Sequence, residues 1–180
     1  ISLLGLGSID DFTVEAPDDF DAEQQSLLEQ APFIEQRTNA IGVTWKNRLK
    51  DGSGFMRTTL SNNTLVNEFT RYEDPQNEQD PFFINDATES ETKLRYEMTK
   101  FFGDLKLFTG LNAQYSFYEN TTRNDIDNQF FDTEIDFMKY GFFVNITNSF
   151  FDDKLDVSAG FRVDDDTFLD DSNILDTFSP

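Results

Sequence analysis

Residues 105–118 read LKLFTGLNAQYSFY, and this stretch decides the fold because its apolar residues recur at every second position. One series is largely apolar: Leu105, Leu107, Thr109, Leu111, Ala113, Tyr115 and Phe117. The alternate series is mixed and mostly polar or small: Lys106, Phe108, Gly110, Asn112, Gln114, Ser116 and Tyr118. Successive side chains of a strand point to opposite sides, so a period of two predicts a β-strand with one apolar and one polar face.

The same alternation recurs along the chain and predicts an all-β protein of about seven strands. We expect them at residues 1–8, 40–49, 55–66, 92–99, 105–118, 135–149 and 155–163. At about 3.3 Å per residue, residues 105–118 would span about 46 Å, whereas common strands have about 5–6 residues. A strand of this length suits a tilted crossing of an apolar layer about 25 Å tall.

Connections of two kinds alternate between the expected strands. Short turns are expected near residues 50–54, 101–104 and 150–154, the first containing an Asp-Gly pair that tolerates the positive φ of a hairpin turn. Longer connections are expected at about 9–38, 67–90 and 119–134, with another after Asp164. Short turns at one end and long loops at the other are typical of an antiparallel up-and-down barrel of the bacterial outer membrane.

Charge is distributed unevenly along the chain, whose formal net charge is -21. The stretches 10–37, 68–91, 119–136 and 164–176, which cover most of these connections, contain 29 of the 35 acidic residues but only three of the 14 basic ones, Arg37, Arg71 and Arg123. A surface this acidic repels a phosphate backbone, so nucleic acid is not an expected partner. The chain has no Cys and no His, which excludes Ser-His and Cys-His nucleophile pairs and histidine zinc sites. We therefore expect no catalysis and no cofactor.

The acidic stretch after residue 163 offers the candidates for a metal site, since hard cations prefer carboxylate ligands. The candidate calcium ligands are Asp164, Asp166 and Asp170. An EF-hand loop beginning at Asp164 would need Gly at its sixth position and Glu at its twelfth, where Leu169 and Leu175 stand. The alternative is an ordinary solvated acidic loop.

Aromatic residues gather where the expected strands end, as in the two girdles of a membrane barrel. One group lies near the short turns and comprises Trp45, Phe55, Phe101, Phe102, Phe150 and Phe151. The second lies toward the long connections and comprises Phe69, Tyr72, Tyr115, Phe117, Tyr118, Phe137 and Tyr140.

Residues 150–164 read FFDDKLDVSAGFRVD and resemble a barrel phrase of the TonB-dependent receptors. In that family a turn is followed by a strand of the form L-x-L-x-x-G-x-R-x-D, and residues 173–180, NILDTFSP, resemble its N-x-L-x-x-x-S-P run. Residues 1–7 and 136–141 look like strands of the versions common in Bacteroidota.

The resemblance implies a 22-stranded barrel closed by a plug domain in the outer membrane of a Gram-negative bacterium. Such a receptor imports a scarce nutrient ligand, using energy delivered through the TonB protein, and its partners would be outer-membrane lipid, its own plug, TonB and that ligand. Residues 1–180 would then be part of the barrel domain, an excerpt from a longer protein, with the plug and the remaining strands outside them.

Seven residues of the polar series are expected to face the lumen of such a barrel: Lys93, Arg95, Lys106, Asn112, Gln114, Lys139 and Arg162. The cationic ones would contact the plug or a passing anionic ligand. The alternative is that they pair with carboxylates on neighbouring strands, namely Glu97, Asp156 and Asp164.

A second function class remains open, a soluble extracellular acidic β-sandwich that binds carbohydrate with the help of calcium. The two classes differ in where the apolar series point. In the barrel the series of Leu105, Leu155 and Leu94 share one outward side of one sheet, with the short turns at one end. In the sandwich they face each other across a core.

Overall fold

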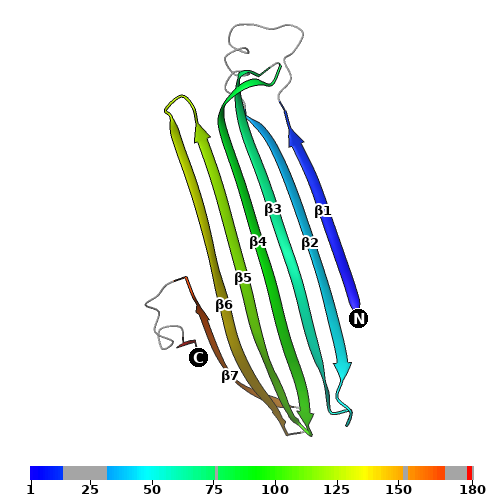
Figure 1. Ribbon diagram of the computed structural model, residues 1–180. Helices are drawn as coiled ribbons and strands as arrows, with labels where there is room; N and C mark the ends of the chain where they lie inside the picture. The colour runs from blue at the N-terminus through cyan, green and yellow to red at the C-terminus, as the bar shows by residue number, and fades with distance from the viewer. Residues whose placement is uncertain (14–31, 76, 152–153, 169–177, 180) are drawn as a thin grey trace.

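The computed structural model describes residues 1–13, 32–75, 77–151, 154–168 and 178–179, which form one antiparallel sheet (Figure 1). Each strand pairs with the next one in the chain, so the order in the sheet is the order in the sequence. The strands are β1 (Ser2–Phe12), β2 (Phe33–Arg48), β3 (Gly54–Asp74), β4 (Gln79–Phe102), β5 (Leu105–Asn124), β6 (Gln129–Phe150), β7 (Leu155–Asp166) and the two-residue β8 (Phe178–Ser179). The expected all-β, up-and-down meander is confirmed.

The described part of the chain contains no helix with the length and apolar character needed to span a membrane.

Two of the expected long connections are wrong in extent. Among the described residues, only 75, 77 and 78 lie outside strands within 67–90, and only 125–128 do so within 119–134. The stretches are hairpin extensions, and β4 alone has 24 residues, or about 79 Å at about 3.3 Å each. Alternation failed to reveal them because the two faces of these extensions do not differ: apolar residues such as Phe82, Phe83, Phe130 and Phe131 stand next to each other among polar ones, and period two reports a strand only where its faces differ.

The three short turns lie at one end of the sheet, as expected (Figure 1). In the β4–β5 turn only Gly103 and Asp104 separate the paired residues Phe102 and Leu105, and Gly103 has a φ of 63°. A two-residue hairpin loop with glycine first needs this left-handed backbone. Residues 77–78 between β3 and β4, and residues 125–128 between β5 and β6, lie at the opposite end. The connection expected at 9–38 is also wrong at both ends, because residues 9–12 lie in β1 and residues 33–38 in β2, while residues 14–31 fall outside the described part of the chain.

Strand register sorts the side chains into two faces, because directly paired residues point to the same side of a sheet. Leu94 pairs with Ala113, and Leu107 pairs with Ile146, which pairs with Ala159. The series of Leu94, Leu105 and Leu155 therefore share one face, here called the apolar face. This confirms the prediction that the three series lie on one side of one sheet. Its side chains are uncovered in this sheet: Leu111 is 54% exposed and Val157 is 50% exposed.

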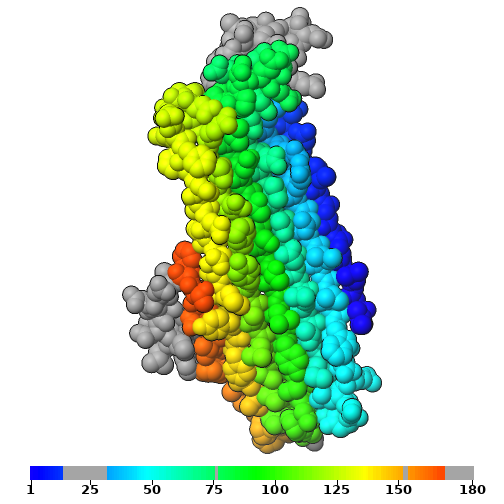
Figure 2. All heavy atoms as spheres, in the orientation of Figure 1, coloured from blue at the N-terminus to red at the C-terminus, as the bar shows by residue number. Residues whose placement is uncertain are grey.

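No second layer covers the apolar face within the described part of the chain. Its strands form a single sheet, which the space-filling view shows as one tall slab (Figure 2). Among the described residues no large side chain is fully buried. A β-sandwich needs two sheets packed face to face over a shared core. The described strands therefore do not have the architecture of the alternative binding module.

Candidate functional site

The seven residues predicted to face a lumen share the face opposite the apolar one, here called the polar face. Arg95 pairs with Asn112, and Lys93 pairs with Gln114, which in turn pairs with Lys139. Lys106 and Arg162 belong to the same face through their own pairings with Thr147 and Phe143. The register thus brings the predicted residues to one side of the sheet, and it remains a prediction that this side lines a lumen.

The polar face is cationic although the chain is anionic. Six successive rows of paired residues cross the polar face from β2 to β7. The first row contains Phe101 and Lys106, and the last contains Asn63, Glu91 and Ser116. In the described strands these rows contain eight cations, Lys46, Arg48, Arg57, Lys93, Arg95, Lys106, Lys139 and Arg162. They contain four carboxylates, Glu91, Glu97, Asp164 and Asp166. The balance of +4 contrasts with -21 for the whole chain.

Glu97 is the most deeply placed carboxylate of this face, only 7% exposed, and it is shared by two arginines. The Nη2 atoms of Arg57 on β3 and Arg95 on β4 each lie 2.7 Å from one of its oxygens. Arg57 Nε also donates to Glu97 at 2.8 Å. One negative charge therefore orients two guanidinium groups, and one positive charge is left uncompensated within this cluster.

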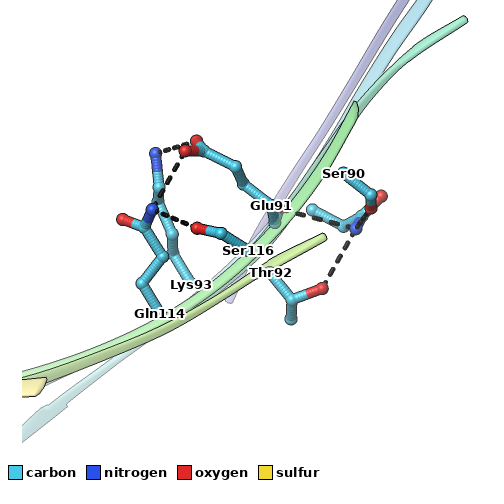
Figure 3. A network of polar contacts seen from close by, with 7 residues as sticks. Ser90, Glu91, Thr92, Lys93, Gln114 and Ser116 are labelled. Atoms are coloured by element: carbon cyan, nitrogen blue, oxygen red, sulfur yellow. Dashed lines mark hydrogen bonds and ion pairs between the residues drawn. The ribbon is translucent and has the colours of Figure 1, made fainter. Parts of the chain in front are cut away.

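A second polar cluster joins β4 and β5 (Figure 3). Its residues on β4, Lys93 and Glu91, lie two and four positions before Arg95 in the chain. Lys93 Nζ lies 2.5 Å from a carboxylate oxygen of Glu91. The Gln114 amide donates to Glu91 at 2.9 Å and to the Ser116 hydroxyl at 2.8 Å. These contacts hold Lys93 and Gln114 in fixed orientations. Ser90 and Thr92, also labelled in this view, lie on the apolar face, where the Asn62 amide donates to both of their hydroxyls at 3.2 Å and 3.0 Å.

A third pair, Arg162 and Asp164, lies on β7. Arg162 Nη2 donates to Asp164 Oδ1 at 2.9 Å, and Arg162 Nε donates to the other oxygen. Gly141 on β6 leaves the space for this carboxylate, because an added Cβ there would overlap it and would lie 2.8 Å from Asn112 Oδ1. The absence of a side chain at Gly141 thus allows Asp164 and Asn112 to approach each other.

The expected pairing of cations with carboxylates on neighbouring strands is therefore mixed. Arg95 pairs with Glu97 and Arg162 with Asp164, but each of these pairs lies within one strand. Asp156 instead accepts a hydrogen bond from the Ser149 hydroxyl at 2.7 Å. Lys139 Nζ lies 5.2 Å from the centroid of the Phe137 ring, a cation–π distance.

A hollow of about 490 Å³ opens in the polar face between β4 and β7. Arg95 and Arg162 stand at its sides, and the rings of Phe108 and Phe143 lie between them, with centroids 4.9 Å apart and planes tilted by 54°. Asn145 and Gly160 also line it. Neither the hollow nor the second arginine on Glu97 was predicted, because a sequence does not fix the register between strands.

The apolar face ends at two tyrosines on the side of the β3–β4 and β5–β6 connections, here called the longer hairpins. The Tyr140 hydroxyl donates to Asp165 at 3.0 Å, and the Tyr115 hydroxyl donates to Asp136 at 3.3 Å. Beyond Tyr115 the same face of β6 carries the acidic residues Asp136, Glu134 and Asp132. Each tyrosine therefore has its ring on the apolar side and its hydroxyl on the polar side of one boundary.

The expected aromatic girdles are divided between the faces. Register places Trp45, Phe102 and Phe150 on the apolar face near the short turns, and Tyr115, Phe117 and Tyr140 on it near the other boundary. Others point to the polar face and are not girdle residues: Phe55, Phe69, Phe101, Tyr118 and Phe137.

The candidate calcium ligands are only partly within the described residues. Asp164 is engaged by Arg162, and Asp166 pairs in register with Lys139. Asp170 lies outside the described residues. In the part of the chain that is described, no group of three or more acidic side chains is arranged to hold a metal ion.

Known proteins resemble this chain in fold only. No family model matches it, and no curated protein matches it in sequence. Among solved structures it is similar to the copper transporter OprC, with a TM-score of 0.55 and 14% identity over 74% of this chain. It also matches BauA, the ferric preacinetobactin receptor from Acinetobacter baumannii, with a TM-score of 0.43, too low to carry an argument, and 10% identity over 77% of this chain.

The chain spans 22% of the length of the first of these structures and 26% of the second. At such identities the likeness concerns the fold alone: the sheet resembles a segment of a TonB-dependent receptor barrel. Neither structure bears on the Bacteroidota expectation, which remains a resemblance.

Proposed function

We propose that this chain forms part of the wall of an outer-membrane receptor barrel, of the TonB-dependent kind, that imports a nutrient ligand and catalyses no reaction. The observation that carries the proposal is the uncovered apolar face of a single sheet with a cationic polar face behind it. Water on both sides would leave the apolar face unfavourably exposed, whereas lipid on one side and an aqueous lumen on the other satisfy both faces.

The height of the apolar face supports this proposal. On β5 it extends from Leu105, which pairs with Phe102, to Tyr115, a distance of ten residues. At about 3.3 Å per residue and a tilt of about 40°, this corresponds to about 33 Å along the strand and about 25 Å across a bilayer. That is the height of the apolar band of an outer-membrane barrel.

The tyrosine boundary agrees with the same interpretation. Aromatic residues with polar tips concentrate at membrane interfaces, where the ring contacts hydrocarbon and the hydroxyl contacts water or polar groups. Tyr115 and Tyr140 have this arrangement, since their hydroxyls bond to carboxylates just beyond the apolar band. In such a barrel the short turns lie in the periplasm and the longer hairpins project from the cell.

The plug, the TonB partner and the nutrient ligand enter the proposal only by analogy with this kind of barrel. The polar face would then meet the plug or the passing ligand with its excess of positive charge. No enzymatic group is invoked, because the chain has neither His nor Cys and its polar residues are bonded to one another as structural pairs.

The proposal is tested by labelling single cysteines from outside the cell, which the absence of native cysteine makes possible. Ile126→Cys lies in the 125–128 turn, where Ile126 is 70% exposed, and Asp104→Cys lies in the β4–β5 turn at the opposite end. In the full protein expressed in a Gram-negative host, a membrane-impermeant maleimide should label residue 126 in intact cells. Residue 104 should react only after the outer membrane is permeabilised. Equal labelling of both residues in intact cells would overturn the proposal.

A further inference from the structure

We propose that the hollow between Arg95 and Arg162 binds a small organic anion, a carboxylate attached to an apolar ring or chain. This inference rests on the proposed function, because only there does the polar face line a water-filled passage that such a molecule can enter. The charge of the hollow, its apolar floor and its size argue for this ligand class.

The excess positive charge beside the hollow arises at Glu97. Because Arg57 and Arg95 share this one carboxylate, the cluster keeps a net positive charge, and Arg95 is 59% exposed at the side of the hollow. Arg162 is also 59% exposed and uses two of its nitrogens on Asp164. A guanidinium group has five N–H donors, so both arginines retain donors for a further anion.

The floor of the hollow explains why the anion should carry an apolar group. The rings of Phe108 and Phe143 lie between the arginines, so a purely inorganic anion would leave this apolar surface uncovered. Gly110 leaves room for the Phe143 ring beside the β5 backbone, since an added Cβ there would be 2.6 Å from Phe143 Cζ. A carboxylate with a ring can bond to an arginine while its ring covers the phenylalanines.

The size of the hollow favours a small molecule over a macromolecular partner. Its volume of about 490 Å³ falls in the range of small-ligand sites, which is about 300–1,000 Å³. A docked acidic protein segment would instead need contacts over a much larger area of the polar face. Binding of an acidic peptide in place of the small anion is therefore an outcome that would overturn the proposal.

The test is a fluorine NMR titration of the full protein in dodecyl maltoside micelles, with 4-fluorobenzoate as the probe and empty micelles as the reference. We expect saturable line broadening with 4-fluorobenzoate that an excess of inorganic phosphate does not reverse. The neutral 4-fluorobenzamide should give no broadening above the reference. Arg95→Gln and Arg162→Gln should each weaken binding about tenfold or more, the loss expected for one charge-assisted hydrogen bond. Lys46→Gln should leave the affinity unchanged, because Lys46 is a cation of the polar face outside the hollow.

Other results would overturn the inference. These are equal binding of the amide, displacement by phosphate, unchanged affinity in both arginine variants, or saturable binding only of an oligo-aspartate peptide. The cysteine labelling described above is carried out on the same variants. If labelling shows the predicted orientation while 4-fluorobenzoate does not bind, the inference alone fails. If labelling fails, the proposed function fails as well.

Discussion

Gly110 shows at the scale of one residue how closely the polar face is packed. An added Cβ would lie 2.5 Å from the Tyr96 carbonyl oxygen and 2.6 Å from Phe143 Cζ, whereas the same atom at Gly5 would meet nothing within 4 Å. Alanine normally stabilises a strand relative to glycine by about 0.5–1 kcal/mol. We predict that Gly110→Ala lowers the free energy of unfolding by about 1–3 kcal/mol, the usual result of overpacking, and that Gly5→Ala does not lower it.

Urea unfolding of both glycine variants from lipid vesicles, followed by tryptophan fluorescence, measures this difference. Equal stability of the Gly110→Ala variant and the unchanged protein would show that the Phe143 ring does not rest on Gly110.

Asp51 in the β2–β3 turn offers a prediction about pH. Its pKa is lowered first by the hydrogen bond from the Ser53 hydroxyl at 2.7 Å and then by the Ser53 backbone N–H at 3.0 Å. A lowered folded-state pKa means that the ionised group stabilises the turn fully above the unfolded value of about 3.9, and the contribution disappears as pH falls through the lower folded pKa. Ser53→Ala should therefore raise the pKa of Asp51 toward its ordinary value.

The Asp51 carboxyl carbon shift, followed by NMR against pH, gives this pKa directly. An unchanged Asp51 pKa in Ser53→Ala would contradict the bonded geometry of the turn.

At the scale of elements, the sequence predicted the centres of the strands but not their ends. Residues 105–118 alternate because one face of the sheet is apolar there and the other is mostly polar, so the pattern and the strand coincide. Beyond Tyr118 both sides are polar, and the strand continues to Asn124 through backbone pairing with β6, which leaves no period in the side chains. The sequence did not reveal the Arg57–Glu97 pair either. Its partners are 40 positions apart in the chain, and only the register between β3 and β4 brings them together.

The hairpin extension of β5 and β6 can be tested by hydrogen exchange. Residues 119–124 and 129–134 pair across the hairpin, so their ladder amides should exchange much more slowly than those of an unfolded peptide. The comparison is a synthetic peptide of residues 119–134 measured under the same conditions. If these amides exchanged as fast in the protein as in the peptide, residues 119–134 would form the long connection that the sequence predicted, and the hairpin extension would be wrong.

The two faces of β5 should differ in their tolerance of charge. Leu111 lies near the middle of the apolar band, and Gln114 lies three positions along on the polar face. In a bilayer Leu111→Arg should lower the free energy of unfolding by about 2–4 kcal/mol, the cost of an arginine on a lipid-facing strand near the midplane. Gln114→Arg should cost about 1 kcal/mol or less, because a polar lumen tolerates the charge.

Urea titrations of both arginine variants in phosphatidylcholine vesicles give the two costs. If Gln114→Arg lowered the free energy of unfolding more than Leu111→Arg does, lipid would contact the polar face, which contradicts the proposed arrangement.

At the scale of the whole molecule, charge and hydropathy divide the sheet consistently. The apolar face is uncovered, the polar face carries a net positive charge in its central rows, and the acidic residues concentrate toward the end with the longer hairpins. Within the described residues β1 pairs on one side only, with β2. An unpaired edge is a site for further strands, so we propose that additional strands of the same barrel complete the sheet.

The central claim is that the apolar face contacts lipid while the polar face contacts water. The most direct measurement is a nitroxide scan along β5, with one spin label at each position from 106 to 115 in the full protein in lipid vesicles. Collision with oxygen, which dissolves in lipid, should peak at 107, 109, 111, 113 and 115, and collision with a water-soluble nickel chelate should peak at the even positions. Odd positions shielded from both reagents, as in the core of a soluble sandwich, would contradict the account.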